Sequence, residues 1–348
     1  MELVWFVLAV VMVAGYVVLD GFDFGAGALH LFVARDDRER RQVLGAIGPF
    51  WDGNEVWLLA AGGVLFLAFP KVLAAGLSGF YLAVFLLLWT LILRGISIEF
   101  RSHVPDRMWR ALWDGVFALA STLAPVLLGA ALGNVVRGVP LDADGWFALP
   151  LFDSFSPTGA LGILDWYTVL VGVTALVGIA QHGALFLAWK VDGAVRTRAR
   201  SAAAVAWPLL IVLWIVLTIV TVSLAPALFD ALAQRPIAWF ACALGAAGLV
   251  VARTASRKER DLLAFLGSCS FLVGALGATA ACTYPVWLRA TTGAERSLTT
   301  ASSAAAESSM RSGLVWWPIG LVLAIGYLVL LFRLHRGKVP PPVEGEGY

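Results

Sequence analysis

Acidic side chains and a histidine lie inside long apolar segments of this sequence. Asp20, Asp23 and His30 fall in the first apolar segment, and Asp52 and Glu55 open the second. A charge in hydrocarbon costs at least about 2.5–3.5 kcal/mol, so such groups face protein or water and commonly mark a proton or ion pathway. The chemistry that these residue types suggest is proton transfer through an apolar medium.

Helical periodicity gathers the polar residues of the first segment on one side. At 100° per residue, Tyr16, Asp20, Asp23, Gly27 and His30 share a stripe about 80° wide. An adjacent face carries a G-x-x-x-G pattern, 21–25, at which a neighbouring helix can approach closely. One side of this helix is therefore expected to pack while the next side carries polar groups.

The second apolar segment is long enough to span a membrane only if the acidic residues at its start are included in the helix. The apolar run from Val56 to Phe69 is too short alone, so the helix must begin near Phe50 and include Asp52 and Glu55. These two acids are then three residues apart on one face, near the positive end of the helix dipole. Such a pair suits a proton acceptor and also suits a helix cap.

Further ionisable residues occur in later apolar segments. Arg94 and Glu99 lie in the third, Asp114 opens the fourth, and His182 lies in the fifth. These four are predicted to form a structural polar network. A purely structural alternative applies to the acids as well, since they could cap helices or brace them against Arg94.

Composition restricts the class of protein. Among 348 residues, 60% are hydrophobic and only 14% are charged, with a mean hydropathy of +0.85. These values exclude a disordered chain, a disulfide-rich secreted domain and an ordinary cytosolic enzyme. The net charge of +2 gives no reason to expect a nucleic-acid partner.

Long continuous apolar runs predict an all-α polytopic membrane protein. Lipid offers no hydrogen bonds to backbone N–H and C=O groups, and a helix pairs these groups within the spanning segment. Residues 1–338 are expected to form one transmembrane domain, and 339–348 a short disordered cytoplasmic tail that begins with prolines. The nine predicted spans are 3–32, 50–69, 79–100, 113–133, 162–189, 203–226, 237–252, 262–284 and 314–332.

Basic residues give the predicted orientation. Eighteen of the 25 Lys and Arg residues fall in alternate connections and the tail, six fall in the opposite connections, and Arg94 lies within a span. Because basic segments stay in the cytoplasm, the N-terminus is predicted outside and the C-terminus inside. The first span lacks a basic start and a cleavage site, so it is expected to be retained. The acids of the spans then lie in the cytoplasmic half.

Metal and haem ligands are scarce. Only His30, His182 and Met12 fall at bilayer depth among four His and four Met, and three cysteines form no CxxC pair. The sequence therefore predicts no metal and no haem in this chain.

Two motifs resemble the signatures of subunit II of cytochrome bd-type quinol oxidases. They are Asp20-Gly-Phe-Asp-Phe-Gly-Ala-Gly27 and Gly48-Pro-Phe-Trp-Asp-Gly-Asn-Glu-Val-Trp-Leu58. Further similarity runs through 80–81, 94–101, 109–114, 129–140 and 181–183, and the least similar part is 285–313.

The resemblance implies a fold and a role. Subunit II of this family folds as two four-helix bundles plus one peripheral helix, and the same fold is expected here. The family's complex oxidises quinol at the outer face and reduces oxygen, with haems b and d held by subunit I, and some members hold a structural quinone in subunit II. Asp52 matches the family's proton-path aspartate, Asp20 and Asp23 match acidic positions of less settled role, and some members have Gln in place of Glu55.

We therefore expect a haem-free oxidase subunit in the bacterial cytoplasmic membrane. It would stabilise subunit I and supply part of a cytoplasmic proton path through Asp52, Asp20, Asp23, Glu55 and His30. Expected partners are the haem-bearing subunit I, small single-span subunits and lipid, with quinol and oxygen as substrates of the complex. The alternatives are a proton-coupled secondary transporter, which would need a substrate cavity and an inverted repeat, and a structural scaffold that tolerates loss of the acids.

Overall fold

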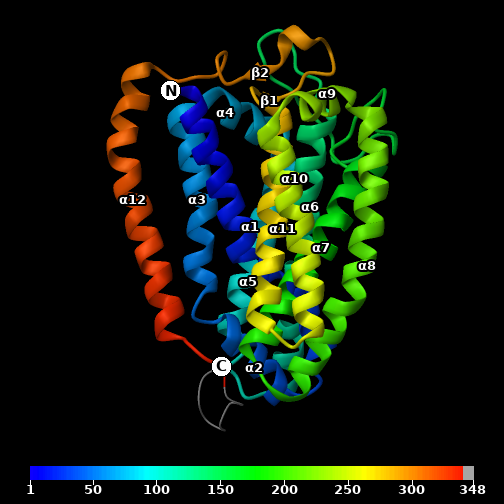
Figure 1. Ribbon diagram of the computed structural model, residues 1–348, viewed down its shortest axis with the longest axis vertical. Coiled ribbons are helices and arrows are strands. Elements are labelled where there is room, and N and C mark those ends of the chain that lie inside the picture. The colour runs from blue at the N-terminus through cyan, green and yellow to red at the C-terminus, as the bar shows by residue number, and fades with distance from the viewer. Residues whose placement is uncertain (340–348) are drawn as a thin grey trace.

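The computed structural model of this protein describes residues 1–339, which are mostly helical (Figure 1). The long helices are α1 (Glu2–Val33), α3 (Trp51–Ala68), α5 (Tyr81–Phe100), α6 (Arg107–Arg137), α7 (Trp166–Lys190), α8 (Gly193–Leu224), α10 (Pro236–Arg257), α11 (Asp261–Thr283) and α12 (Glu307–Leu334). The shorter elements are α2 (Asp37–Ile47), α4 (Pro70–Gly79), α9 (Pro226–Gln234), the 3₁₀ turn η1 (Ala294–Arg296) and a hairpin of β1 (Val286–Leu288) and β2 (Leu298–Thr299).

Each predicted span corresponds to one long helix. Eight of these helices are long and apolar enough to cross a membrane, and α3 meets the same criterion together with α4, although the pair is bent by 120°. The all-α, multi-span prediction is thus confirmed, with eight candidate spans among the described residues, or nine if the bent pair of α3 and α4 counts as one. The largest error is at α8, which begins at Gly193 instead of residue 203. Arginine and alanine favour helix, so the span continues as helix beyond its apolar part.

The long helices form two groups of four, as the resemblance implies. In the first group, α1 packs against α3 and α6, and α6 packs against α5; in the second, α7 packs against α8 and α11, and α10 packs against α11. Helix α12 lies at the edge, where it contacts α3 and is largely exposed (Figure 1). It is the expected peripheral helix.

Glycines join the two groups. The G-x-x-x-G face of α1 meets α7, as expected of that pattern. A Cβ atom added to Gly25 would lie 2.1 Å from the Ile179 carbonyl oxygen, and one added to Gly183 would lie 2.3 Å from the Gly25 carbonyl carbon. No side chain fits between these backbones.

The connections divide between two ends of the molecule. Helix α2 and the turns after α5, α7 and α10 lie at one end, which we call the arginine-rich end, whereas α4, α9 and the hairpin lie at the other (Figure 1). The start of α1 and the end of α12 lie at opposite ends. The arginine-rich end is the one predicted to face the cytoplasm.

Most of the predicted tail, 340–348, lies outside the described residues. Val339, which precedes it, is held at the arginine-rich end. Its backbone N–H donates to the Lys190 carbonyl oxygen at 2.7 Å, and its own carbonyl accepts from Gln42 Nε2 at 3.3 Å.

Candidate functional site

Arg94 joins three helices of the first group. From α5, its Nη1 donates to Asp20 Oδ1 on α1 and its Nη2 donates to Glu55 Oε1 on α3 at 2.5 Å. Arg94 and Asp20 are fully buried, whereas the Glu55 side chain is 32% exposed. The guanidinium also lies over the Phe24 ring, 4.3 Å from its centroid.

Asp23 lies one turn from Asp20 and has a different partner. Asn54 Nδ2 donates to Asp23 Oδ2 at 2.7 Å and to the Leu19 carbonyl oxygen at 3.2 Å. Asp23 and Asn54 are also fully buried. We call Asp20, Asp23, Asn54, Glu55 and Arg94 the Arg94 cluster.

The Arg94 cluster contains more carboxylates than cations. Its three acids are accompanied by one guanidinium, which binds Asp20 and Glu55 but not Asp23. Asp20 Oδ2 and Asp23 Oδ1 have no hydrogen-bond partner among residues 1–339. Burial disfavours uncompensated charge, and neighbouring acids disfavour ionising together. This arrangement can hold and exchange protons.

A second cluster lies nearer the arginine-rich end, around Asp114 on α6. The Asp114 carboxylate contacts His30 Nε2 at 2.7 Å, Arg101 Nε at 2.6 Å and Arg40 Nη1 at 2.9 Å. Arg101 Nη2 also donates to Asp37 Oδ1 at 2.8 Å. We call these five residues the Asp114 cluster. Because the Asp37 side chain is 43% exposed, the cluster reaches the surface.

Local sequence positions the Asp114 cluster. The Asp106 side chain accepts the Trp109 backbone N–H and so starts α6 two turns before Asp114. Asp36 caps α2 in the same way, through the Glu39 N–H. Helix α2, with Asp37 and Arg40, was not predicted because its eleven residues, six of them charged or polar, carry no spanning signal.

Three of the predicted site residues lie apart from both clusters. Asp52 is exposed on α3 and does not join Glu55, whose side chain turns toward Arg94. Glu99 is exposed on α5. His182 is buried in the second group, where Nδ1 pairs with Ser268 Oγ at 2.7 Å and Nε2 with the Val18 carbonyl oxygen at 2.8 Å.

The structure adds Asn54, Arg101 and Arg40 to the residues considered from the sequence. Asn54 stands within the motif that contains Asp52, at a helix position where an amide gains little unless it has a partner. That was a usable signal. Nothing in the sequence distinguishes Arg40 or Arg101 from the other arginines of basic connections.

Outside the spans, the arginine-rich end contains a further ion pair. Arg198 Nη2 lies 2.5 Å from Glu39 Oε2. The Arg198 guanidinium holds the pKa of the Glu39 carboxyl below its ordinary value. This pair ties α2 to α8.

An apolar cavity of about 530 Å³ lies between the two groups of helices. Its walls come mainly from α1, α6, α7, α8 and α11, with a few residues of α3, α9 and α10, and include Tyr16, Phe24 and Phe271. Asp20 and Asp23 do not line it. The Tyr167 hydroxyl, at the wall, pairs with Thr221 Oγ1 at 2.9 Å.

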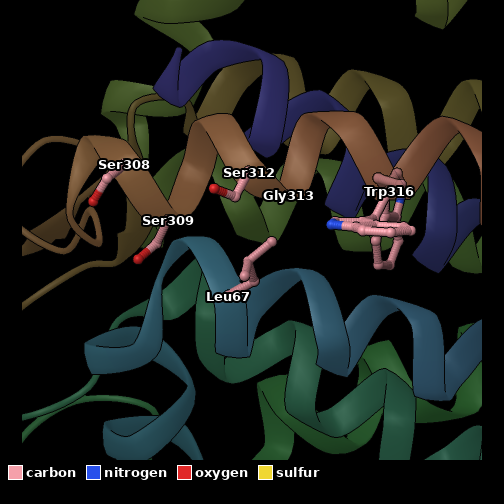
Figure 2. Close-up of a pocket in the computed structure, with 7 residues that line it drawn as sticks. Leu67, Ser308, Ser309, Ser312, Gly313 and Trp316 are labelled. Carbon is pink, nitrogen blue, oxygen red and sulfur yellow. The ribbon is translucent and has the colours of Figure 1, made fainter.

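A second pocket, of about 480 Å³, lies between α3 and the start of α12 (Figure 2). Leu67 faces Ser309, Ser312 and Trp316 across it. The residues that line it include no acid, base or histidine. It offers no proton-transfer chemistry.

These features define a polytopic α-helical membrane protein with two four-helix groups and buried acids at one end of the first group. The family model for cytochrome bd terminal oxidase subunit II matches residues 1–335, so the chain belongs to that family. The resemblance drawn from the two motifs is thereby confirmed.

Individual relatives agree. The probable cytochrome oxidase subunit 2 of Haemophilus influenzae is 30% identical over 97% of this chain and 95% of its own length. The cytochrome bd-I ubiquinol oxidase subunit 2 of Escherichia coli is 38% identical over 59% of this chain, and the match spans about half (53%) of that relative. The structure of the bd oxidase from Geobacillus thermodenitrificans includes a chain with the same fold, with a TM-score of 0.74 at 20% identity, covering 96% of this chain and 98% of that one.

Proposed function

We propose that this protein is the haem-free subunit II of a quinol:oxygen oxidoreductase of the respiratory chain, and that it supplies protons from the cytoplasm to the oxygen-reduction site of its partner. Family membership supports the class of complex. The Arg94 cluster is the observation on which the proton-transfer role rests. It brings three acids and an amide together inside a membrane-spanning helix group.

The proposed path begins at Asp52. This residue is exposed on α3, near the arginine-rich end, and Glu55 follows one turn further into the helix. Glu55 and Asp20 are bonded to the same guanidinium. Arg94 itself stays charged and orients the two carboxylates. Protons would pass from Asp52 to Glu55 and then to Asp20 and Asp23.

An exposed face of α3 supports a haem-bearing partner. Asp52, Val56, Leu59 and Phe66 are exposed and follow one stripe of the helix. An aspartate beside apolar side chains in a membrane needs protein or water against it. We assign this face to subunit I, which would lie against α3 beside Asp52 and receive protons that have passed along the path; small single-span subunits and lipid would cover other exposed faces.

The engagement of His182 supports a haem-free chain. Both ring nitrogens are occupied by protein groups, so neither is free to ligate iron. With His182 engaged in this way, we assign haems b and d to the partner subunit, as the resemblance to the family implies. We place the chain in the bacterial cytoplasmic membrane. Quinol oxidation at the outer face and proton uptake from the cytoplasm would make the reaction electrogenic.

The apolar cavity fits the chain of a structural quinone. Its lining is almost wholly apolar, as an isoprenoid tail requires, and Tyr16 brings a buried hydroxyl that would hold a headgroup oxygen. The same lining argues against the alternative of a proton-coupled transporter, because the acids expected to bind a coupled substrate lie outside the cavity.

Asp52→Asn tests the proposed path. The variant should slow oxygen consumption by the purified complex, since Asn cannot carry a proton, and leave the visible haem spectrum unchanged. Asp230→Asn, the same substitution at an exposed aspartate of α9, serves as the control and should keep full turnover. Unchanged turnover in Asp52→Asn would remove Asp52 from the path, and lost haem would make its role structural.

A further inference from the structure

A row of buried polar atoms that lack hydrogen-bond partners follows the polar stripe of α1. His30 Nδ1, Ser121 Oγ and Asp23 Oδ1 each lack a hydrogen-bond partner in the part of the chain that the structure describes, residues 1–339. All three residues are fully buried. Buried polar atoms almost always have a partner, either protein or ordered water. Three such atoms in succession along one seam therefore indicate a bound ligand.

Gly27 brings Ser121 into this seam. A Cβ atom at Gly27 would lie 2.1 Å from Ser121 Oγ, so the α6 hydroxyl sits against the α1 backbone. On α1, Gly27 lies between His30 and Asp23. The helical rise separates those two residues by about 10 Å and places Gly27 roughly midway. Each half of that interval has the length that one or two water molecules bridge.

His30 closes the seam at the arginine-rich end. Its Nε2 contacts Asp114, whose carboxylate also holds Arg101 and Arg40. The Phe117 ring packs edge-on against the imidazole, 5.3 Å between centroids. With Nε2 donating its proton to Asp114, Nδ1 is an acceptor.

We propose that the α1–α6 seam from His30 to Asp23 binds a file of water molecules, with Ser121 as its midpoint, and that His30 holds a proton at its arginine-rich end. The inference rests on the proposed function and adds to it a branch that does not pass through Asp52.

The chemistry of the branch is a reversible proton transfer. In the Nδ1–H tautomer, His30 Nε2 takes up a proton from the side of Asp114, and the resulting imidazolium gives its Nδ1 proton to the first water of the file, toward Asp23. The ring is left as the Nε2–H tautomer, and tautomer exchange resets it. Asp114 balances the imidazolium charge, while Arg101 and Arg40 oppose it. Water can satisfy Ser121 Oγ and Asp23 Oδ1 along the way, since hydroxyl and carboxylate oxygens both accept from it.

His30→Gln and Ser121→Ala test the branch in the purified complex. Gln retains a donor toward Asp114 but holds no proton, and Ala removes the hydroxyl without adding bulk beside Gly27. Both should slow proton uptake during oxygen reduction several-fold with haem spectra intact, and His30→Gln should remove one titrating group from the pH profile of turnover. The matched controls are His182→Gln and Ser268→Ala, a buried pair already bonded to each other, which should keep the wild-type rate.

The outcomes separate this inference from the proposed function. Wild-type uptake in both His30→Gln and Ser121→Ala, with slow uptake in Asp23→Asn, would overturn the branch and leave the main path intact. Wild-type uptake in all three would overturn both. If His30→Gln lost its haem-bearing partner, Ser121→Ala would decide, and an unchanged rate there would overturn the branch.

Discussion

The two four-helix groups are similar in architecture and opposite in their interiors. In the first group, α3 and α5 are bridged by Arg94, which binds acids from α1 and α3. In the second, α10 and α11 approach through glycine, since a Cβ atom at Gly248 would lie 2.5 Å from the Phe271 backbone nitrogen. The first group holds ionisable side chains in its interior, whereas in the second group two helix backbones approach directly at glycine.

This contrast shows how one helical scaffold can serve two purposes. Closely packed helices with small residues leave no space for water or protons. Helices held apart by charged side chains keep polar atoms along a continuous line. The first group therefore suits proton transfer, and the second suits packing and an apolar ligand.

Loss of the Arg94 side chain should destabilise the first group most. Arg94→Gln leaves Asp20 and Glu55 without their cation, and breaking a buried ion pair costs about 3–5 kcal/mol. The assembled complex should lose thermal stability and haem content. Arg253→Gln is the control in the second group, because Arg253 only overlies Trp207 at 5.6 Å, a contact worth about 0.5–1 kcal/mol. Equal losses in the two variants would contradict the contrast between the groups.

The second group should be most sensitive to added volume. Gly248→Ala must push α10 and α11 apart, and overpacking typically costs about 1–3 kcal/mol. Gly62→Ala in α3 meets nothing within 4 Å and should be neutral or slightly stabilising. Thermal denaturation of the two variants measures the difference, and a stable Gly248→Ala protein would show that the close approach is dispensable.

The weakest expected effect lies at the arginine-rich end. Because Arg198 lowers the pKa of Glu39, the pair stabilises the fold at neutral pH and loses this contribution as the pH falls below the ordinary carboxyl value of 4.5. Glu39→Gln should cost less than about 1 kcal/mol at pH 7, as surface pairs do. The wild type and variant should converge in thermal stability in acid; a constant difference across pH would refute the linkage.

The spans were predictable because length and hydropathy determine them. Each predicted apolar run falls on one long helix, and the positions of Asp20, Asp23 and His30 on one stripe of α1 followed from periodicity alone. The short helices α2, α4 and α9 carry no such signal, since they neither span nor alternate clearly. The 120° bend after α3 depends on packing beyond local sequence.

Contacts between residues far apart in the sequence were harder to predict from the sequence. Sequence places Asp52 and Glu55 on one helix face, yet Glu55 binds Arg94 and Asp52 is exposed, because the choice depends on where α5 lies. The contact of His30 with Asp114 joins residues 84 positions apart. Helical periodicity assigns a face but cannot name the helix opposite it.

Asp23→Asn gives the most direct test of proton transfer through the first group. Asp23 makes no ion pair with Arg94, and Asn can keep the hydrogen bond with Asn54 after an amide rotation, so the fold and the haem spectrum should survive. Oxygen consumption by the purified complex should fall several-fold, in step with proton uptake. Full turnover in a complex with a normal haem spectrum would contradict the account.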